Sequence, residues 1–183
     1  MATNLEKLPD IDAPCGKYLT FRDFIECSDT WKHHEVANIP KEIESYKALE
    51  VLAAEVIDPV IDDLGRVKLT YGAGTPELTS KIRTRIAPRL DQHAAFEVNP
   101  KGALICDRGG AACDFLVIGV DSLTVAKWVV KNTRFDRLYF YGQSKPLHVS
   151  VTENPSSKCS VVTRNVKGRV MLRTYSRERF LKF

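Results

Sequence analysis

The residues with the clearest potential for chemistry are two histidines and one aspartate in the second half of the chain. His93 follows a polar pair, Asp114 ends the segment Gly110–Asp114, and His148 lies within the apolar run Leu147–Val151. Two imidazoles and one carboxylate can hold a zinc ion and leave one coordination position open for water or substrate. The same ligands also suit iron, nickel or manganese. The long spacing between the three residues does not define a site by itself, so the prediction depends on the strand-like runs beside them.

The bulk composition is that of an ordinary globular domain with a mildly basic charge. The chain has 183 residues, of which 44% are hydrophobic, which is enough for one domain with a real core. Its net charge of +4 permits contact with nucleic acid or anionic substrates but does not require it. The five cysteines are an odd number without a CxxC pair, which argues against a disulfide framework or a thiolate zinc site. Cys113 directly precedes Asp114, so on a strand its side chain faces away from a metal there.

The N-terminal residues 1–17 are expected to form a loose leader ahead of a single domain over residues 18–183. This leader is polar and lacks the apolar core of a secretory signal. No apolar run in the chain approaches the roughly 18–20 residues needed to span a bilayer. We therefore expect a cytoplasmic protein with no membrane partner.

Hydrophobic periodicity predicts helices in the first part of the chain and strands mixed with helices in the second. Helices are expected over residues 21–26, 31–34, 43–57, 76–86, 122–131 and 175–183, with a kink at Asp58-Pro59 or a second short helix up to Leu64. Strands are expected over residues 66–71, 112–120, 135–141, 147–152, 160–163 and 169–173. This order argues for an α+β fold rather than a doubly wound one.

Two groups of basic residues have more than one interpretation. The first contains Lys81, Arg83, Arg85 and Arg89, and the second contains Arg164, Lys167, Arg169, Arg173, Arg177 and Arg179, interleaved with Tyr175 and Phe180. Both groups could be ordinary solvated faces, with the two aromatic rings docking a C-terminal element on the core. Alternatively, the basic residues could contact phosphates while the aromatic rings stack on bases. His33 and His34 lie in an early polar segment and are interpreted as surface residues.

Several motifs resemble the zinc D-Ala-D-Ala carboxypeptidase and Hedgehog-type peptidase family, in particular the small phage and bacterial members that cut cell-wall peptides. The resemblance covers residues 18–151. Residues 18–24 look like the family's Y-x-T-x-x-E-F opening, residues 52–64 like its long helix with a D-P step, and residues 75–78 like its S-P-x-L motif. The family's metal pattern is a histidine, then Gly-x-Ala-x-Asp, then a final histidine before a strand. Here those positions are His93, Gly110, Ala112, Asp114 and His148.

The resemblance implies a divergent member of that family with a peptide-like substrate. It implies a central, mostly antiparallel sheet with helices on one side, and one Zn²⁺ held by His93, Asp114 and His148. It also exposes three departures from the family pattern. The family's arginine that clamps a substrate carboxylate is replaced by Gly74, and residues 97–109 form an insertion that would border the metal site.

The third departure concerns the family's glutamate base, which lies shortly before the last histidine. This chain has no carboxylate between Asp136 and Glu153, and the expected positions hold Tyr141, Gly142 or Lys145. A metal can lower the pKa of its bound water to about 7 without such a base. Losing a positioned base nevertheless usually costs about two to four orders of magnitude in rate.

Two functions of different classes follow from these observations. The first is a zinc-dependent hydrolase, a peptidase or amidase with altered specificity, in which Tyr141 donates a hydrogen bond to the oxyanion and Glu153 or Glu97 acts as a displaced base. As purely structural residues, Tyr141 would be a core tyrosine and the two glutamates surface residues. The alternative is a binding module that keeps the fold and the metal without catalysis, with a protein or nucleic-acid partner. A third interpretation, metal-dependent phosphoester hydrolysis, combines the metal with the basic surface.

Overall fold

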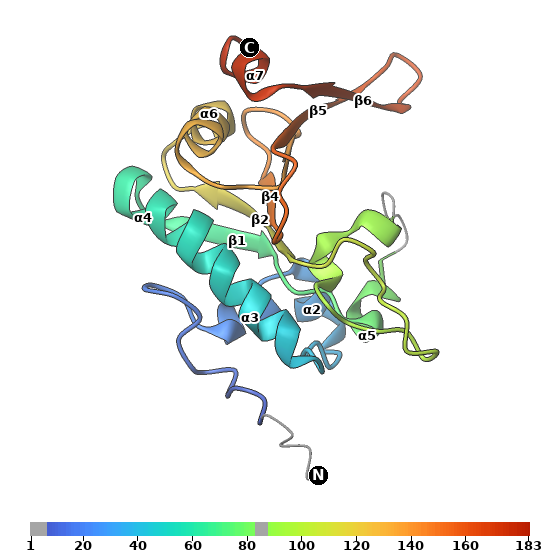
Figure 1. The fold of residues 1–183 in the computed structure, drawn as a ribbon. Coiled ribbons are helices and arrows are strands. Elements are labelled where there is room, and N and C mark those ends of the chain that lie inside the picture. Colours follow the sequence, from blue (N-terminus) through green and yellow to red (C-terminus); the bar gives the residue numbers. More distant parts are fainter. Residues whose placement is uncertain (1–6, 83–87) are drawn as a thin grey trace.

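A six-stranded sheet organises the computed structural model, which describes residues 7–82 and 88–183 (Figure 1). Its strands are β1 (Val67–Tyr71), β2 (Ala111–Val117), β3 (Arg137–Phe140), β4 (Leu147–Val151), β5 (Lys158–Arg164) and β6 (Val170–Tyr175). The spatial order is β1-β2-β4-β3-β5-β6, and every neighbouring pair is antiparallel except the parallel pair β3 and β5. The predicted α+β class with a mostly antiparallel sheet is therefore confirmed.

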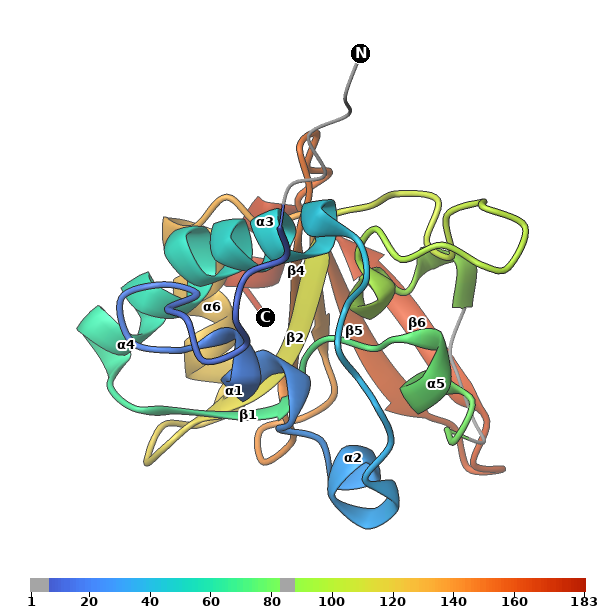
Figure 2. The same cartoon turned by 90° about the horizontal axis from the view of Figure 1, so that it is seen from below.

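Six helical segments of the described chain pack on one face of this sheet and enclose the core. They are α1 (Phe21–Ile25), α3 (Ile43–Leu52), a π-helical turn η1 (Ala53–Ile57), α4 (Asp58–Leu64), α6 (Ser122–Asn132) and α7 (Arg177–Leu181). Along β2 the side chains alternate, so that Cys113 and Phe115 are fully buried against these helices while Asp114 points to the other face. We call this second face the polar face. Seen from below, α3, α4 and α6 lie on one side of β2 and α5 (Pro76–Thr79) lies on the other (Figure 2).

The long predicted helix contains a local change of winding at the Asp58-Pro59 step. The Asp58 N–H bonds to the carbonyl of Ala53, five residues back, which is the π-helical spacing. Pro59 then occupies the first turn of α4, where its missing N–H is tolerated. The helix continues through this turn to Leu64, where the second of the two predicted alternatives placed its end, and Gly65, with a positive φ of 98°, ends it.

The chain between β1 and β2 covers part of the polar face with short turns rather than with a long helix. It contains α5 and two 3₁₀ turns, η2 (Pro88–Leu90) and η3 (Gln92–Ala94). The helix predicted for residues 76–86 ends at Thr79, and its basic residues Arg83 and Arg85 lie outside the described residues. The expected insertion, residues 97–109, follows η3 and carries an isolated bridge between Val98 and Leu104.

The N-terminal segment lies against the domain over its described part, whereas a loose leader was expected. Ala13 and Ile11 accept backbone hydrogen bonds from Phe21 and Arg22, and Cys15 is only 1% exposed. Burial of this apolar thiol in the core explains why the segment is held. Helix α2 (Asp29–His34) follows, and His33 and His34 are exposed on it, as predicted. Among the described residues, no helix is both long and apolar enough to cross a bilayer.

Candidate metal centre

The antiparallel register of two central strands brings Asp114 and His148 together. Asp114 on β2 lies directly opposite His148 on β4, and their neighbours Cys113 and Val149 form the next cross-strand pair. Directly opposed residues of adjacent strands point to the same face. Because Cys113 and Val149 are fully buried in the core, Asp114 and His148 must share the polar face. The prediction that Cys113 faces away from the site is thus confirmed.

His93 reaches the same place from the turn η3, which the backbone around it fixes. The Asp91 carboxylate accepts the His93 N–H, and Gly74 N–H donates to the His93 carbonyl. The imidazole Nδ1 lies 2.7 Å from the carbonyl oxygen of Gly72. Gly72 is required there, because a Cβ atom on it would lie 2.2 Å from the carbonyl oxygen of Phe24. These contacts orient the ring before any ligand arrives.

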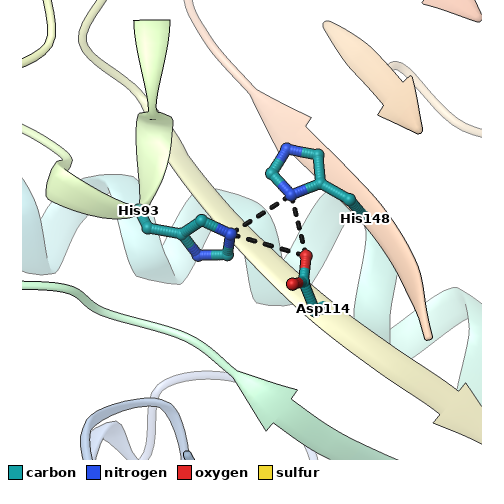
Figure 3. Close-up of side chains that lie close together, drawn as sticks. All are labelled: His93, Asp114 and His148. Atoms are coloured by element: carbon teal, nitrogen blue, oxygen red, sulfur yellow. Dashed lines mark hydrogen bonds and ion pairs between the residues drawn. The ribbon is translucent and has the colours of Figure 1, made fainter. Parts of the chain in front are cut away.

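Three side-chain atoms converge at this point (Figure 3). His93 Nε2 lies 3.2 Å from His148 Nδ1 and 3.4 Å from Asp114 Oδ1, and the last two atoms are 2.8 Å apart. In a tetrahedral zinc site with bonds of about 2.0–2.1 Å, the ligand atoms lie about 3.3 Å apart. Two sides of the observed triangle are close to this value, and the third, between Asp114 and His148, has the length of a hydrogen bond. The described residues His93, Asp114 and His148 can therefore hold a metal ion.

The protons of the site can be assigned in part from its hydrogen bonds. A carbonyl oxygen can only accept, so His93 Nδ1 must donate its hydrogen to Gly72. In the neutral ring, Nε2 is then a bare acceptor that faces the carboxylate oxygen of Asp114. Two acceptors that face each other repel unless a proton or a cation lies between them. A backbone carbonyl that accepts from the remote ring nitrogen is also the usual arrangement for a metal-binding histidine.

The electrostatics of the site agree with this assignment. Burial, the largest single effect, lowers the pKa of His93. The charge of Asp114 and its hydrogen bond, together with the charge of Asp91 and the hydrogen bond to Gly72, nevertheless raise that pKa above its ordinary value. Burial alone would raise the pKa of Asp114, yet the two histidines hold it well below its usual range. Asp114 is thus ionised at neutral pH. Its side chain is 27% exposed and that of His148 is 12% exposed, so the site is reached from the polar face.

Aromatic rings and one glycine complete the surroundings. The ring of Tyr71 packs edge-on against His93 at 4.4 Å between centroids, and Tyr139 packs in the same way against His148 at 5.1 Å. Gly110 precedes β2 with φ of 83°, and a Cβ on it would lie 1.9 Å from the carbonyl oxygen of Val151. A glycine there lets β2 and β4 approach each other four residues before Asp114.

The residues predicted to act in catalysis are placed very differently from one another. Tyr141 is 37% exposed. Its pKa is raised by burial and by the negative charges of Asp114 and Asp91, so its side chain lies near the site. Glu153 is exposed, and none of its described contacts involves the triad. Glu97 is buried instead of lying on the surface, and it accepts hydrogen bonds from the Lys41 and Glu42 backbone.

Glu97 therefore anchors the start of α3 and is a poor candidate for the displaced base. Its carboxylate also accepts the Ser45 hydroxyl at 2.8 Å. The sequence alone did not indicate three neighbours of the triad, Asp91, Tyr71 and Tyr139. The Asp91-x-His93 spacing, which is typical of a side chain capping the following turn, could have indicated the first of these.

A hollow elsewhere on the described surface contains none of the three metal-ligand candidates. Its volume is about 620 Å³, and it is lined by parts of α1, α4 and β1, including Arg22 and Glu26. Arg22 pairs with Glu26 at 2.6 Å and with Asp12 at 2.6 Å, so its charges are already matched within the chain. The triad, and not this hollow, has the geometry for chemistry.

Comparisons of the chain with protein-family models, curated proteins and solved structures found no match.

Proposed function

We propose that this chain is a metal-dependent hydrolase, with zinc as its ion and an amide bond of a peptide-like molecule as its target. The observation that carries the proposal is the convergence of His93 Nε2, His148 Nδ1 and Asp114 Oδ1 at 2.8 to 3.4 Å from one another. Two nitrogen ligands and one carboxylate oxygen suit zinc, although another divalent metal could replace it. The resemblance to D-Ala-D-Ala carboxypeptidase-type enzymes supports a peptidase or amidase reaction.

The roles of the chain's own residues follow from their positions. His93, Asp114 and His148 would hold the ion, which when bound supplies a Lewis acid for the scissile carbonyl and a water of lowered pKa. The Gly72 carbonyl keeps the His93 ring in the tautomer whose Nε2 is free to bind. Tyr141 would donate its phenolic hydrogen to the oxyanion, and its raised pKa keeps that hydrogen in place at neutral pH.

Asp91 is our candidate for the general base. Its negative charge raises the pKa of both His93 and Tyr141, so it lies beside the site, whereas Glu97 binds the start of α3. Asp91 is also closer in sequence to a metal-ligand candidate than Glu153 is. Asp91→Asn keeps a side chain that can cap η3 but removes the proton acceptor. We expect this variant to keep its metal and to lose about 10²–10⁴-fold in kcat. An unchanged kcat in Asp91→Asn, together with a large loss in Glu153→Gln, would transfer the role to Glu153.

The first test is the metal content of the purified protein by elemental analysis. We expect about one zinc ion per chain in the wild type and almost none in His148→Ala. His33→Ala is the matched control, because His33 is exposed on α2 and should not affect the content. Hydrolysis of peptide amides is then compared with hydrolysis of phosphodiesters. A wild-type protein that contains no metal and takes up none from added zinc would overturn the proposal.

A second candidate function, nucleic-acid binding, is favoured by the charge of the C-terminal region. From Lys158 to Phe183 the chain has eight basic residues and one acidic residue, although the net charge of the whole chain is only +4. Strands β5 and β6 and helix α7 carry these charges, and the turn between the strands extends beyond the rest of the sheet (Figure 1). Binding to a single-stranded oligonucleotide that weakens steeply with salt would support this function.

A further inference from the structure

One buried amide lies between the turn that carries His93 and the two strands that carry the other metal-ligand candidates. Gln92 precedes His93 in η3 and is only 1% exposed. Its Nε2 donates to the carbonyl oxygens of Gly109 at 3.1 Å and of Val151 at 3.3 Å. Its Oε1 accepts the hydroxyl hydrogen of Ser150 at 2.7 Å. Both amide hydrogens and the amide oxygen are thus used inside the protein.

These partners also fix the orientation of the amide group. The carbonyl oxygens of Gly109 and Val151 can only accept hydrogen bonds, so the NH₂ group of Gln92 must face them. In the flipped orientation the amide oxygen would face two other acceptors, and both of its present donor bonds would be lost. Only one placement of this side chain therefore satisfies its surroundings.

The partners of the amide belong to the strands that hold the rest of the triad. Ser150 and Val151 end β4, two and three residues after His148, and Gly109 lies two residues before the start of β2. Residues two apart on a strand share a face and lie about 7 Å apart, so Ser150 is on the polar face beside His148. The amide of Gln92 therefore joins the turn η3 to β4 and to the entrance of β2, close to the triad.

Outside the triad, the hydrogen bonds described for His93 hold it from the side of β1 and from within its own turn. Gly74 N–H donates to its carbonyl at 2.8 Å, and its Nδ1 donates to the Gly72 carbonyl at 2.7 Å. Both glycines follow β1, so these bonds orient the ring without fixing its distance from β4. A metal site needs its ligand atoms within about 0.5 Å of the working geometry. Gln92 supplies the link across which that distance is set.

We propose that Gln92 is a positioning residue that keeps His93 in register with Asp114 and His148 and thereby sets the affinity of the site for a divalent metal. The inference rests on the metal site of the hydrolase proposed above, but not on which bond is cleaved. A buried network with all its hydrogen bonds made is rigid, so the ligand atoms are held in place before the ion arrives. The loss of hydrogen bonds that orient metal ligands typically weakens metal binding by about 10- to 100-fold.

The test measures the zinc affinity of the full chain by competition with a chromogenic chelator. Gln92→Met keeps a side chain of similar length but removes the three hydrogen bonds, and we expect it to weaken zinc binding by about 10- to 100-fold. Ser150→Ala removes only the bond to Oε1, so we expect a smaller loss, and this variant decides the test if Gln92→Met does not fold. The visible absorption of bound cobalt(II) should also change in both variants, because it reports the coordination geometry and not the stability of the fold.

Val130→Ala is the control for a general loss of stability, because Val130 is fully buried in α6 on the other face of the sheet. It should lower the melting temperature of the metal-free protein, while its zinc affinity stays within about twofold of that of the wild type. The inference is overturned if Gln92→Met and Ser150→Ala bind zinc as tightly as the wild type, or if Val130→Ala loses as much affinity as they do. A wild type that binds no zinc overturns it together with the hydrolase proposal. Zinc binding that depends on Gln92, in a protein that hydrolyses no substrate, supports the inference while the hydrolase proposal fails.

Discussion

At the scale of single residues, the triad is a site where a proton and a metal compete. The Gly72 carbonyl fixes the hydrogen of His93 on Nδ1, so Nε2 can take up either a second proton or a cation. With a proton, the imidazolium pairs with Asp114 at 3.4 Å. With a metal, the same lone pair becomes a ligand. The state of the site is therefore set by pH and by metal concentration together.

This competition predicts opposite pH dependences for the two forms of the protein. The pKa of His93 is raised in the folded chain, so the ring binds its proton more tightly in the folded than in the unfolded state. In metal-free protein the resulting stability is fully present below about pH 6.5 and is lost as pH rises through the raised pKa. The additional stability given by zinc should increase over the same interval, because the metal needs the bare nitrogen.

Melting curves of chelator-treated and zinc-loaded protein between about pH 5.5 and 8.5 measure both trends. The difference in melting temperature between the two forms should widen as pH rises. His93→Gln should remove most of this widening, whereas the matched change His33→Gln, on the exposed surface, should not. A zinc effect that is constant over the whole range would contradict the assigned role of His93.

At the scale of elements, the insertion is held at both of its ends by buried charge. At its start, Glu97 binds the backbone N–H groups of Lys41 and Glu42 and the Ser45 hydroxyl, which caps α3. At its end, Arg108 forms a bidentate pair with the fully buried Asp136 that precedes β3. The loop beside the metal site is thus tied to a helix and to a strand that are distant from it in sequence.

Arg108→Ala should therefore be among the most destabilising changes outside the apolar core. It leaves the carboxylate of Asp136 buried without its main counter-ion, and breaking such a pair typically costs about 3–5 kcal/mol. Arg66→Ala, the change of an exposed arginine, should lower the free energy of unfolding by no more than about 0.5 kcal/mol. Urea denaturation of both variants measures the difference. Equal stabilities would mean that Arg108 does not compensate the charge of Asp136.

Glu97→Gln separates the structural from the catalytic interpretation of that residue. The amide keeps one acceptor but introduces a donor where the Lys41 and Glu42 N–H groups already point, so we expect a loss of about 1–3 kcal/mol in the free energy of unfolding. The zinc content per folded chain and kcat should not change. A fall in kcat without a fall in stability would instead make Glu97 a catalytic group.

At the scale of the whole molecule, local patterns predicted the elements but not the contacts that assemble them. The alternation of β2 and the helical period of α3 and α6 are properties of short windows, and these elements are found where the sequence places them. The parallel pairing of β3 with β5 and the anchors of the insertion connect residues that are distant in sequence. The pairing of β3 with β4 likewise places Tyr139 beside His148, so this neighbour of the triad could not be predicted from local patterns.

The basic C-terminal region, from Lys158 to Phe183, is separate from the three metal-ligand candidates, because its strands β5 and β6 carry none of them. If this region binds single-stranded nucleic acid, each phosphate contact contributes about 0.7 to the slope of log affinity against log salt concentration. Replacement of Lys167, Arg169 and Arg173 by glutamine should therefore reduce the magnitude of this slope by up to about 2. The control replaces Arg66, Lys68 and Lys101, which are exposed outside that region, and so removes the same total charge. Zinc content should remain at the wild-type level in both variants, because the triad lies on β2, β4 and η3. Equal slopes in the two variants would mean that only net charge matters, and that β5 and β6 form no specific binding surface.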